Sequence, residues 1–396
     1  MALPLLLAQS CPGPAAGGST GDFDAVLLPR RGGPVPCHAA LLRARCPALD
    51  LGSDGSVRVD EDEAVVLGVL RWVYREALDL KDLAESPRSD LGGRVARLAE
   101  AWGLRDVAVL RERLVRSWRT ARQRGSLAAD VLRAYDAGEL GSLRFLFDGA
   151  PHEAGQEPPC VYGGLPIILR AASSYFRAML SGSWAESAGC ERAPVRVCWP
   201  SQQLRKLVRF LHGGPFVSGP GDLPDAVECG DYFGVPALLA HANDWIAGNL
   251  EVSNAASLWG FVGREPRLRL DWLRDAAATE RLPWTDLTVD ADDACFDFHV
   301  REFVALAADP EDGDGSWVPL HDLSPALMLR LVSSGLVAMS TEPMKAAVER
   351  FAKAKTGGGA DGKALARSLL PPAVLFNREL RDALVCTTAP SIRTLL

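Results

Sequence analysis

The residues best spaced for chemistry lie in a glycine-rich run, Gly357-Gly358-Gly359-Ala360-Asp361-Gly362-Lys363. Through its lysine, this run has the spacing of a P-loop, in which backbone N–H groups cradle phosphates. A P-loop also needs a preceding strand and a following Ser or Thr that binds Mg²⁺. Here Ala364 follows, and the apolar residues before the run, Met344, Val348 and Phe351, have helical spacing. We therefore predict a loop between two helices and no nucleotide cofactor.

The other side chains that could bind a metal or act in catalysis are scattered. The nine cysteines form no Cys-x-x-Cys pair and the six histidines are equally dispersed, which predicts reduced thiols and no zinc site. The acidic stretches 290–293 and 309–314 lack the glycine and closing glutamate of a calcium loop, so we expect loops or a solvated face. We expect a structural role for His38 and predict no catalytic residue, cofactor or metal.

A row of arginines occupies positions 111–124, with Arg113, Arg116, Arg119 and Arg122 at intervals of three. This spacing puts neighbours on adjoining positions of a helix. It is typical of a solvated linker helix; the alternative is a docking strip for acidic protein or phosphate.

Composition favours a soluble protein of two or three domains. The chain has 396 residues, of which 48% are hydrophobic and 23% charged, with a formal net charge of −7. The acidic balance argues against nucleic acid as the main partner. No apolar run approaches the roughly 18 residues that span a bilayer, so we expect no membrane partner and a cytoplasmic or nuclear location. Residues 1–20, rich in Pro, Gly and Ser, are expected to form a disordered tail.

Two segments carry the same order of patterns. Residues 21–116 read as a strand, a turn over 29–36, a helix, an alternating strand and helices with a break at Gly103. Residues 140–250 repeat this order, and their Tyr232-Phe233-Gly234-Val235-Pro236 stands where Ala101-Trp102-Gly103-Leu104-Arg105 stood before. The duplication predicts two α+β domains of roughly 100 residues, joined by a basic helical linker over 117–139.

The remainder, 251–388, shows helical patterns and no convincing strand. One predicted helix covers 327–332, with Ser324 as its cap and Pro325 at its first position. We expect an all-α region here.

The second segment resembles a BTB/POZ domain through Ser173-Ser174-Tyr175-Phe176-Arg177-Ala178-Met179-Leu180, which matches the Ser-x-Tyr-Phe-x-x-Met run of that family. Trp245–Leu250 resembles the family's last helix. The first segment keeps the family's Asp24 and His38 but lacks the Tyr-Phe-x-x-Met run. The second has lost both, with Ser142 or a neighbour in place of the Asp and Leu165 or Gly164 in place of the His. The resemblance implies two tandem BTB/POZ folds, each degenerate in a different place.

The C-terminal region resembles a BACK domain, the helical segment that follows BTB in many adaptors. The matching stretches are 252–255 with Leu258 and Trp259, 327–339, 344–351, and 369–370 with 379–380; the section Asp271–Ser316 fits poorly. The whole arrangement is similar to the BTB part of ankyrin-BTB proteins.

A further motif, Trp184-Ala185-Glu186, follows the Phe-x-x-Met helix. In cullin-3-binding BTB domains, a hydrophobic residue, any residue and a Glu occupy this place. The resemblance implies that Tyr175, Phe176, Met179, Trp184 and Glu186 form a cullin contact. The alternative is that Trp184 caps the domain's own core and Glu186 is solvated.

The resemblance implies a non-enzymatic adaptor, a substrate-recruiting subunit of a cullin-RING ubiquitin ligase that docks through the second segment and holds an unknown client protein. The alternative is a scaffold or assembly protein with no ubiquitin role; a third class, an enzyme on a divergent fold, finds no supporting motif. We expect the two BTB copies to pair within one chain, because a short link gives them a high effective concentration. Homodimerisation is the competing outcome.

Overall fold

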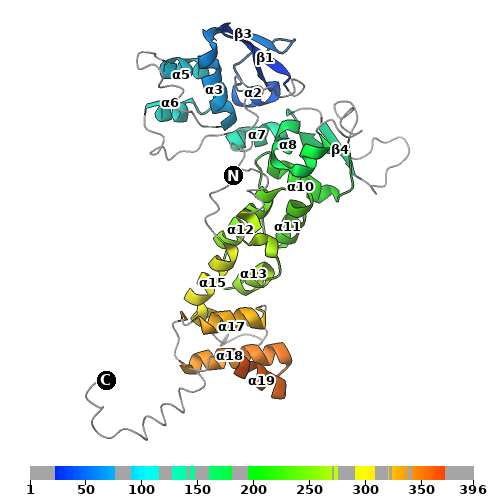
Figure 1. The fold of residues 1–396 in the computed structure, drawn as a ribbon, viewed down its shortest axis with the longest axis vertical. Coiled ribbons are helices and arrows are strands. Elements are labelled where there is room, and N and C mark those ends of the chain that lie inside the picture. The colour runs from blue at the N-terminus through cyan, green and yellow to red at the C-terminus, as the bar shows by residue number, and fades with distance from the viewer. Residues whose placement is uncertain are drawn as a thin grey trace, which may run out of the picture. The chain divides into compact units, whose positions relative to one another are not determined.

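The computed structural model describes residues 23–75, 91–115, 127–140, 143–147, 160–180, 195–269, 272–274, 290–307, 320, 323–334, 336–337 and 341–370. It divides into two compact units, residues 1–241 with 275–285, and 242–274 with 286–396. Each unit is considered separately below (Figure 1).

The first segment of unit one is built on a three-stranded sheet in the order β2-β1-β3. Strand β1 (Ala25–Arg31) pairs antiparallel with β2 (Val35–Cys37) and parallel with β3 (Ser56–Asp62). Helices α2 (Ala39–Arg45), α3 (Glu63–Arg75), α5 (Leu91–Ala101) and α6 (Val107–Val115) complete it. Its core includes Leu27, Leu41, Val66 and Leu70, all with 0% exposure.

The second segment has the same topology, with strand order β5-β4-β6. Strand β4 (Leu143–Phe147) pairs antiparallel with β5 (Cys160–Gly164) and parallel with β6 (Val195–Val197). The helices are α8 (Pro166–Ala172), α9 (Ser174–Met179), α10 (Ser201–Leu211), α11 (Leu223–Tyr232) and α12 (Pro236–Gly248), with a 3₁₀ turn at Pro220–Asp222. The predicted duplication of element order is therefore present in the structure.

The predicted turn over 29–36 was wrong in extent. Strand β1 continues through Pro29 to Arg31, the chain turns at Gly32 with φ +110°, and β2 follows directly. The pattern missed β2, which follows a proline- and glycine-rich stretch, and β5, whose last two residues are glycine; Pro and Gly are depleted in strands.

Two glycines mark the same bend in both segments, as the sequence alignment predicted. Gly103 has φ +69° and Gly234 has φ +57°, values that a side chain would strain. A Cβ on Gly103 would lie 2.9 Å from the Cβ of Ala48, and one on Gly234 would clash with the hydroxyl of Ser174. Glycine is thus required at both positions.

The linker region contributes a packed helix, α7 (Leu127–Asp136). Leu127 and Val131 have 0% exposure, and the helix packs against α2 of the first segment. The hydroxyl of Tyr135 donates to the carbonyl of Tyr162 in β5, 3.0 Å away, so α7 contacts the second segment as well. Of the predicted arginine row, Arg116, Arg119, Arg122 and Arg124 lie outside the described residues.

The regular secondary structure in the described part of unit two is all helical. Its helices are α13 (Ala255–Val262), α15 (Ala291–Arg301), α16 (Phe303–Ala307), α17 (Pro325–Ser333), α18 (Thr341–Thr356) and α19 (Gly359–Leu369), with a 3₁₀ turn at Pro266–Leu268. The predicted cap of α17 is confirmed, because the Ser324 hydroxyl accepts the N–H of Leu327 at 3.2 Å. None of the helices in the described ranges has the length and apolar character that crossing a membrane requires.

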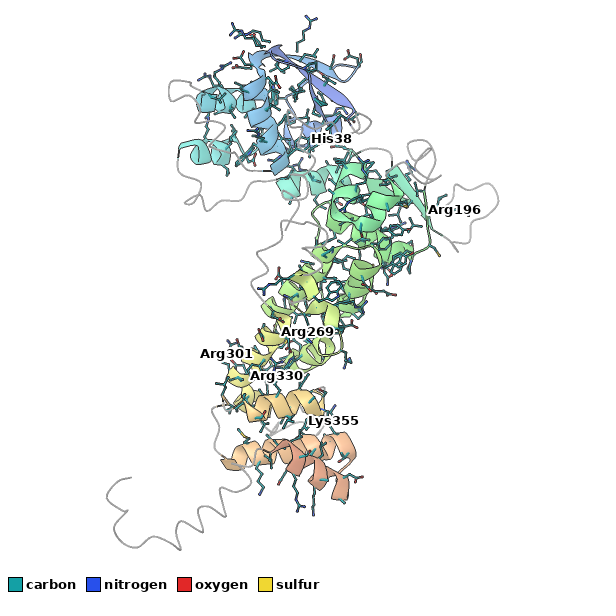
Figure 2. The ribbon with its side chains drawn as sticks, viewed as in Figure 1. His38, Arg196, Arg269, Arg301, Arg330 and Lys355 are labelled. Atoms are coloured by element: carbon teal, nitrogen blue, oxygen red, sulfur yellow. The ribbon has the colours of Figure 1, made fainter. Side chains whose placement is uncertain are left out.

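The acidic stretch 290–293 is not a loop but the start of α15, where Asp293 is exposed to solvent, as expected of a solvated face. Asp290 caps α15 by accepting the N–H of Asp292 at 2.9 Å. The Asp292 carboxylate in turn accepts the indole N–H of Trp259 at 2.7 Å and pairs with Arg330 at 2.5 Å (Figure 2). These acids therefore fasten α13, α15 and α17 together; the second acidic stretch, 309–314, lies outside the described residues.

Candidate protein-docking site

A buried serine positions the helix that carries the site. Ser173 has 0% exposure and is the N-cap of α9, where its hydroxyl accepts the N–H of Phe176 at 3.1 Å. The same hydroxyl donates to the carbonyl of Phe233 at 2.6 Å. Because one hydroxyl holds both segments of chain, the start of α9 is fixed against the end of α11.

An inner layer of aromatic rings lies behind this joint. Phe176 stacks on Phe145 of β4, with ring centroids 5.3 Å apart, and on Phe233, with centroids 5.4 Å apart. All three rings have 0% exposure. They form a rigid apolar floor that spans the sheet, α9 and the end of α11.

An outer layer of three aromatic side chains covers that floor and reaches solvent. We call Tyr175, Trp199 and Tyr232 the aromatic face. The rings of Trp199 and Tyr232 lie 4.3 Å apart, and those of Tyr175 and Tyr232 lie 5.6 Å apart. Tyr232 is 48% exposed and the other two are half-buried. Pre-ordered aromatic rings that remain accessible to solvent are a common anchor for protein partners.

Among the described residues of the first segment, two positions of this face hold small side chains. The N–H of Ala48 donates to the carbonyl of Trp102 at 3.2 Å, as the N–H of Tyr175 does to the carbonyl of Phe233 at 3.4 Å, so Ala48 corresponds to Tyr175. Counted from the matched glycines, Ala101 corresponds to Tyr232. The two tyrosines of the face are thus alanines in the other segment.

Residues 166–250 match the model of the BTB/POZ domain family. This part of the chain is a BTB/POZ domain. BTB domains are in general modules that bind protein partners or dimerise, rather than catalytic domains. The match includes Tyr175, Trp199 and Tyr232, so the aromatic face belongs to the BTB domain. No curated protein sequence matches the chain.

The predicted cullin contact is only partly visible. Phe176 and Met179 are buried, at 0% and 4% exposure, so they support the BTB domain from within. Tyr175 lies on the aromatic face. Trp184 and Glu186 fall outside the described residues, and their role stays a prediction.

His38 has the structural role expected of it. It is 3% exposed at the start of α2, and its ring Nδ1 lies 2.7 Å from the hydroxyl of Tyr74 (Figure 2). The same hydroxyl accepts the N–H of His38 at 3.0 Å. In the BTB domain the corresponding N–H, that of Leu165, donates to His212 Nε2 at 3.1 Å. Leu165 thus lies where His38 lies in the first segment, and His212 at the end of α10 accepts there the hydrogen bond that Tyr74 accepts in the first segment.

The thiols and histidines of the described ranges form no constellation of metal ligands. Cys37, Cys46, Cys229 and Cys295 are buried, as expected of small core residues. Burial raises the pKa of each of these thiols to about 12, so they are protonated and unreactive.

Two groups escaped the reasoning from sequence. The sequence patterns predict no role for Trp199, and they place Tyr232 only in the bend before Gly234. They predict no role for Arg45 either, which has 0% exposure. It pairs with Asp106 and with Asp130 of α7, each at 3.0 Å. No spacing in the sequence links those three residues.

Proposed function

We propose that the chain is a non-catalytic adaptor whose BTB domain docks a protein partner on the aromatic face. The observation that carries this proposal is the exposure of Tyr232 over a rigid floor, at a place where the first segment has alanine. Large aromatic side chains at the centre of an interface supply much of the binding free energy.

We propose further that the partner is a cullin and that the chain recruits a client for ubiquitination. Two features support this: Tyr175 of the aromatic face belongs to the Ser-x-Tyr-Phe-x-x-Met run, and Trp184-Ala185-Glu186 comes shortly after that run in the sequence. Residues 21–116 would be a second BTB copy and residues 251–388 a BACK-like region; both offer surfaces for the client. A scaffold without a ubiquitin role is the second candidate, since the same face would serve any protein partner.

Calorimetric titration of the full chain with a purified cullin-3 amino-terminal domain tests the proposal. We expect Tyr232→Ala to weaken binding by about 2 kcal/mol, roughly thirtyfold, and Trp184→Ala to do the same. Val304→Ala is the control, because Val304 is 60% exposed on α16 and its loss also removes exposed apolar surface.

Three outcomes separate the candidates. Binding that both variants weaken and the control preserves supports the cullin adaptor. Binding that neither variant changes removes the aromatic face and the Trp184 motif from consideration. A wild-type chain that does not bind cullin at all, but loses its cellular partners on Tyr232→Ala, identifies the scaffold.

A further inference from the structure

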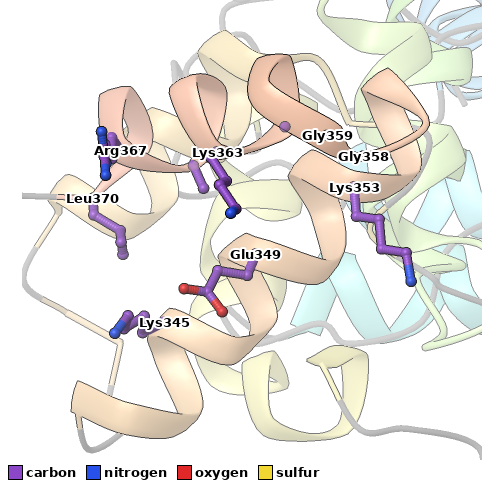
Figure 3. A pocket seen from close by; sticks show the side chains of 10 residues that line it. Lys345, Glu349, Lys353, Gly358, Gly359, Lys363, Arg367 and Leu370 are labelled. Atoms are coloured by element: carbon purple, nitrogen blue, oxygen red, sulfur yellow. The ribbon is translucent and has the colours of Figure 1, made fainter.

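A groove in unit two runs between α18 and α19 (Figure 3). Its volume is about 570 Å³. Buried Gly362, Ala366 and Leu370 line it, and their small or apolar side chains leave its floor open. The glycine-rich run at the start of α19 closes one end. The run was predicted to be a loop between two helices, but the loop is only Gly357 and Gly358, because α19 already begins at Gly359.

The walls of the groove are basic on both sides. Lys345 and Lys353 come from α18, and Lys363 and Arg367 come from α19. With Glu349 as the single acid in the lining, the groove has a surplus of three positive charges on a chain whose net charge is −7. These five side chains make no ion pair with any residue that the structure describes. The groove therefore presents charge that a partner can neutralise.

We infer that this groove binds an acidic, extended peptide segment of a protein partner. Lys345, Glu349 and Lys353 follow one another at intervals of four along one face of α18, so their charges are spread over roughly 12 Å. A row of charges with an apolar floor fits a chain of carboxylates better than it fits one compact anion. The inference rests on the proposed adaptor function, for which the groove would be a client site.

The arrangement disfavours phosphate as the ligand. A phosphate site needs N–H groups and cations that converge on one point. Here the acidic Asp361 occupies the first turn of α19, and Glu349 lies between the two lysines of α18. Figure 3 shows Lys363 extending from α19 toward the side of α18 that carries Glu349. The Glu349 carboxylate predicts a preference for peptides in which a neutral or basic residue separates two acidic pairs.

Fluorescence polarisation of a labelled peptide, Glu-Glu-Lys-Glu-Glu with neutral flanks, against the full chain tests the inference. The double variant Lys363→Glu with Arg367→Glu should weaken binding by at least about tenfold, because both exposed side chains become repulsive. Lys363→Glu alone should also weaken binding, and Lys355→Glu is its matched control, because it makes the same charge change on exposed α18 surface outside the groove. Glu349→Gln should abolish the preference over an all-glutamate peptide.

If Lys363→Glu and Lys355→Glu lose peptide affinity equally, the effect arises from net charge alone. The groove is then not the peptide-binding site. Tripolyphosphate that binds the wild-type chain, while the peptide does not, would make it a phosphate site instead and overturn the peptide assignment. Cullin binding is measured on the same variants: groove variants that lose the peptide but keep the cullin support two separate sites. If the chain binds the peptide but not the cullin, only the cullin proposal is contradicted.

Discussion

The two segments of unit one share a topology but differ in where their polar and aromatic side chains lie. In the first segment, Arg45 ends α2 and pairs with Asp106, which also accepts the indole N–H of Trp72 at 3.1 Å. The corresponding positions of the BTB domain hold Ala172, Ala237 and Phe210, all buried.

At the surface the BTB domain carries the larger side chains: it has the aromatic face where the first segment has Ala48 and Ala101. A common framework thus leaves certain positions free to vary. The first segment uses one set of positions to hold α7, and the BTB domain uses a different set to present rings to solvent.

The largest expected effect concerns the two ends of α7. Arg45→Ala leaves the carboxylates of Asp106 and Asp130, exposed by 5% and 4%, without their buried cation. We expect a loss of about 3–5 kcal/mol in the free energy of unfolding, measured by urea denaturation. The control is Arg209→Ala at the other end of α7. Its pair with Asp136 is exposed by 40% and 46%, so its loss should cost about 0–1 kcal/mol. Similar losses of unfolding free energy in both variants would contradict the expected difference between the buried and the exposed ion pair.

A smaller effect on stability distinguishes Tyr74 from His212, the side chains that accept the backbone N–H groups of His38 and Leu165. Burial lowers the pKa of His212 to about 4 from the ordinary 6.5, so the folded BTB domain keeps this ring neutral. Between pH 6.5 and 4 the unfolded chain binds a proton that the folded chain does not, so stability falls as the pH falls. The full loss amounts to about 3 kcal/mol. A tyrosine does not titrate in this range.

His212→Gln should therefore flatten the decline of stability from pH 6.5 to 4. His299 in unit two, whose pKa burial also lowers to about 4, is unchanged in that variant. The readout is the difference between the wild-type and variant slopes in denaturation at stepped pH. Parallel slopes would rule out His212 as the origin.

The smallest effect concerns the cap that supports the aromatic face. Ser173→Ala removes both hydrogen bonds of a buried hydroxyl and should cost about 1–2 kcal/mol. Ser174→Ala is the control, because the neighbouring hydroxyl makes no hydrogen bond within the described ranges. Thermal unfolding followed by circular dichroism compares the two; a larger loss in the control would refute the role of the cap.

Local patterns in the sequence determined much of the framework. The alternation of β3, the helical stripes of α3 and α10, the bends at Gly103 and Gly234 and the cap at Ser324 all follow from spacing or from backbone geometry. The Ser-x-Tyr-Phe-x-x-Met run was enough to indicate the BTB family. Such features depend on residues within one turn or one strand, so the amino-acid sequence alone is enough to predict them.

Only the tertiary structure decided which residues meet. Trp199 and Tyr232 are far apart in the sequence, and so are Arg45 and Asp130; the fold brings each pair together. The groove lysines, read in sequence as parts of a helix and of a glycine-rich loop, face one space because α18 and α19 pack as neighbours. Long-range contacts depend on how elements pack, and packing is shared by many side chains at once, so no single spacing encodes it.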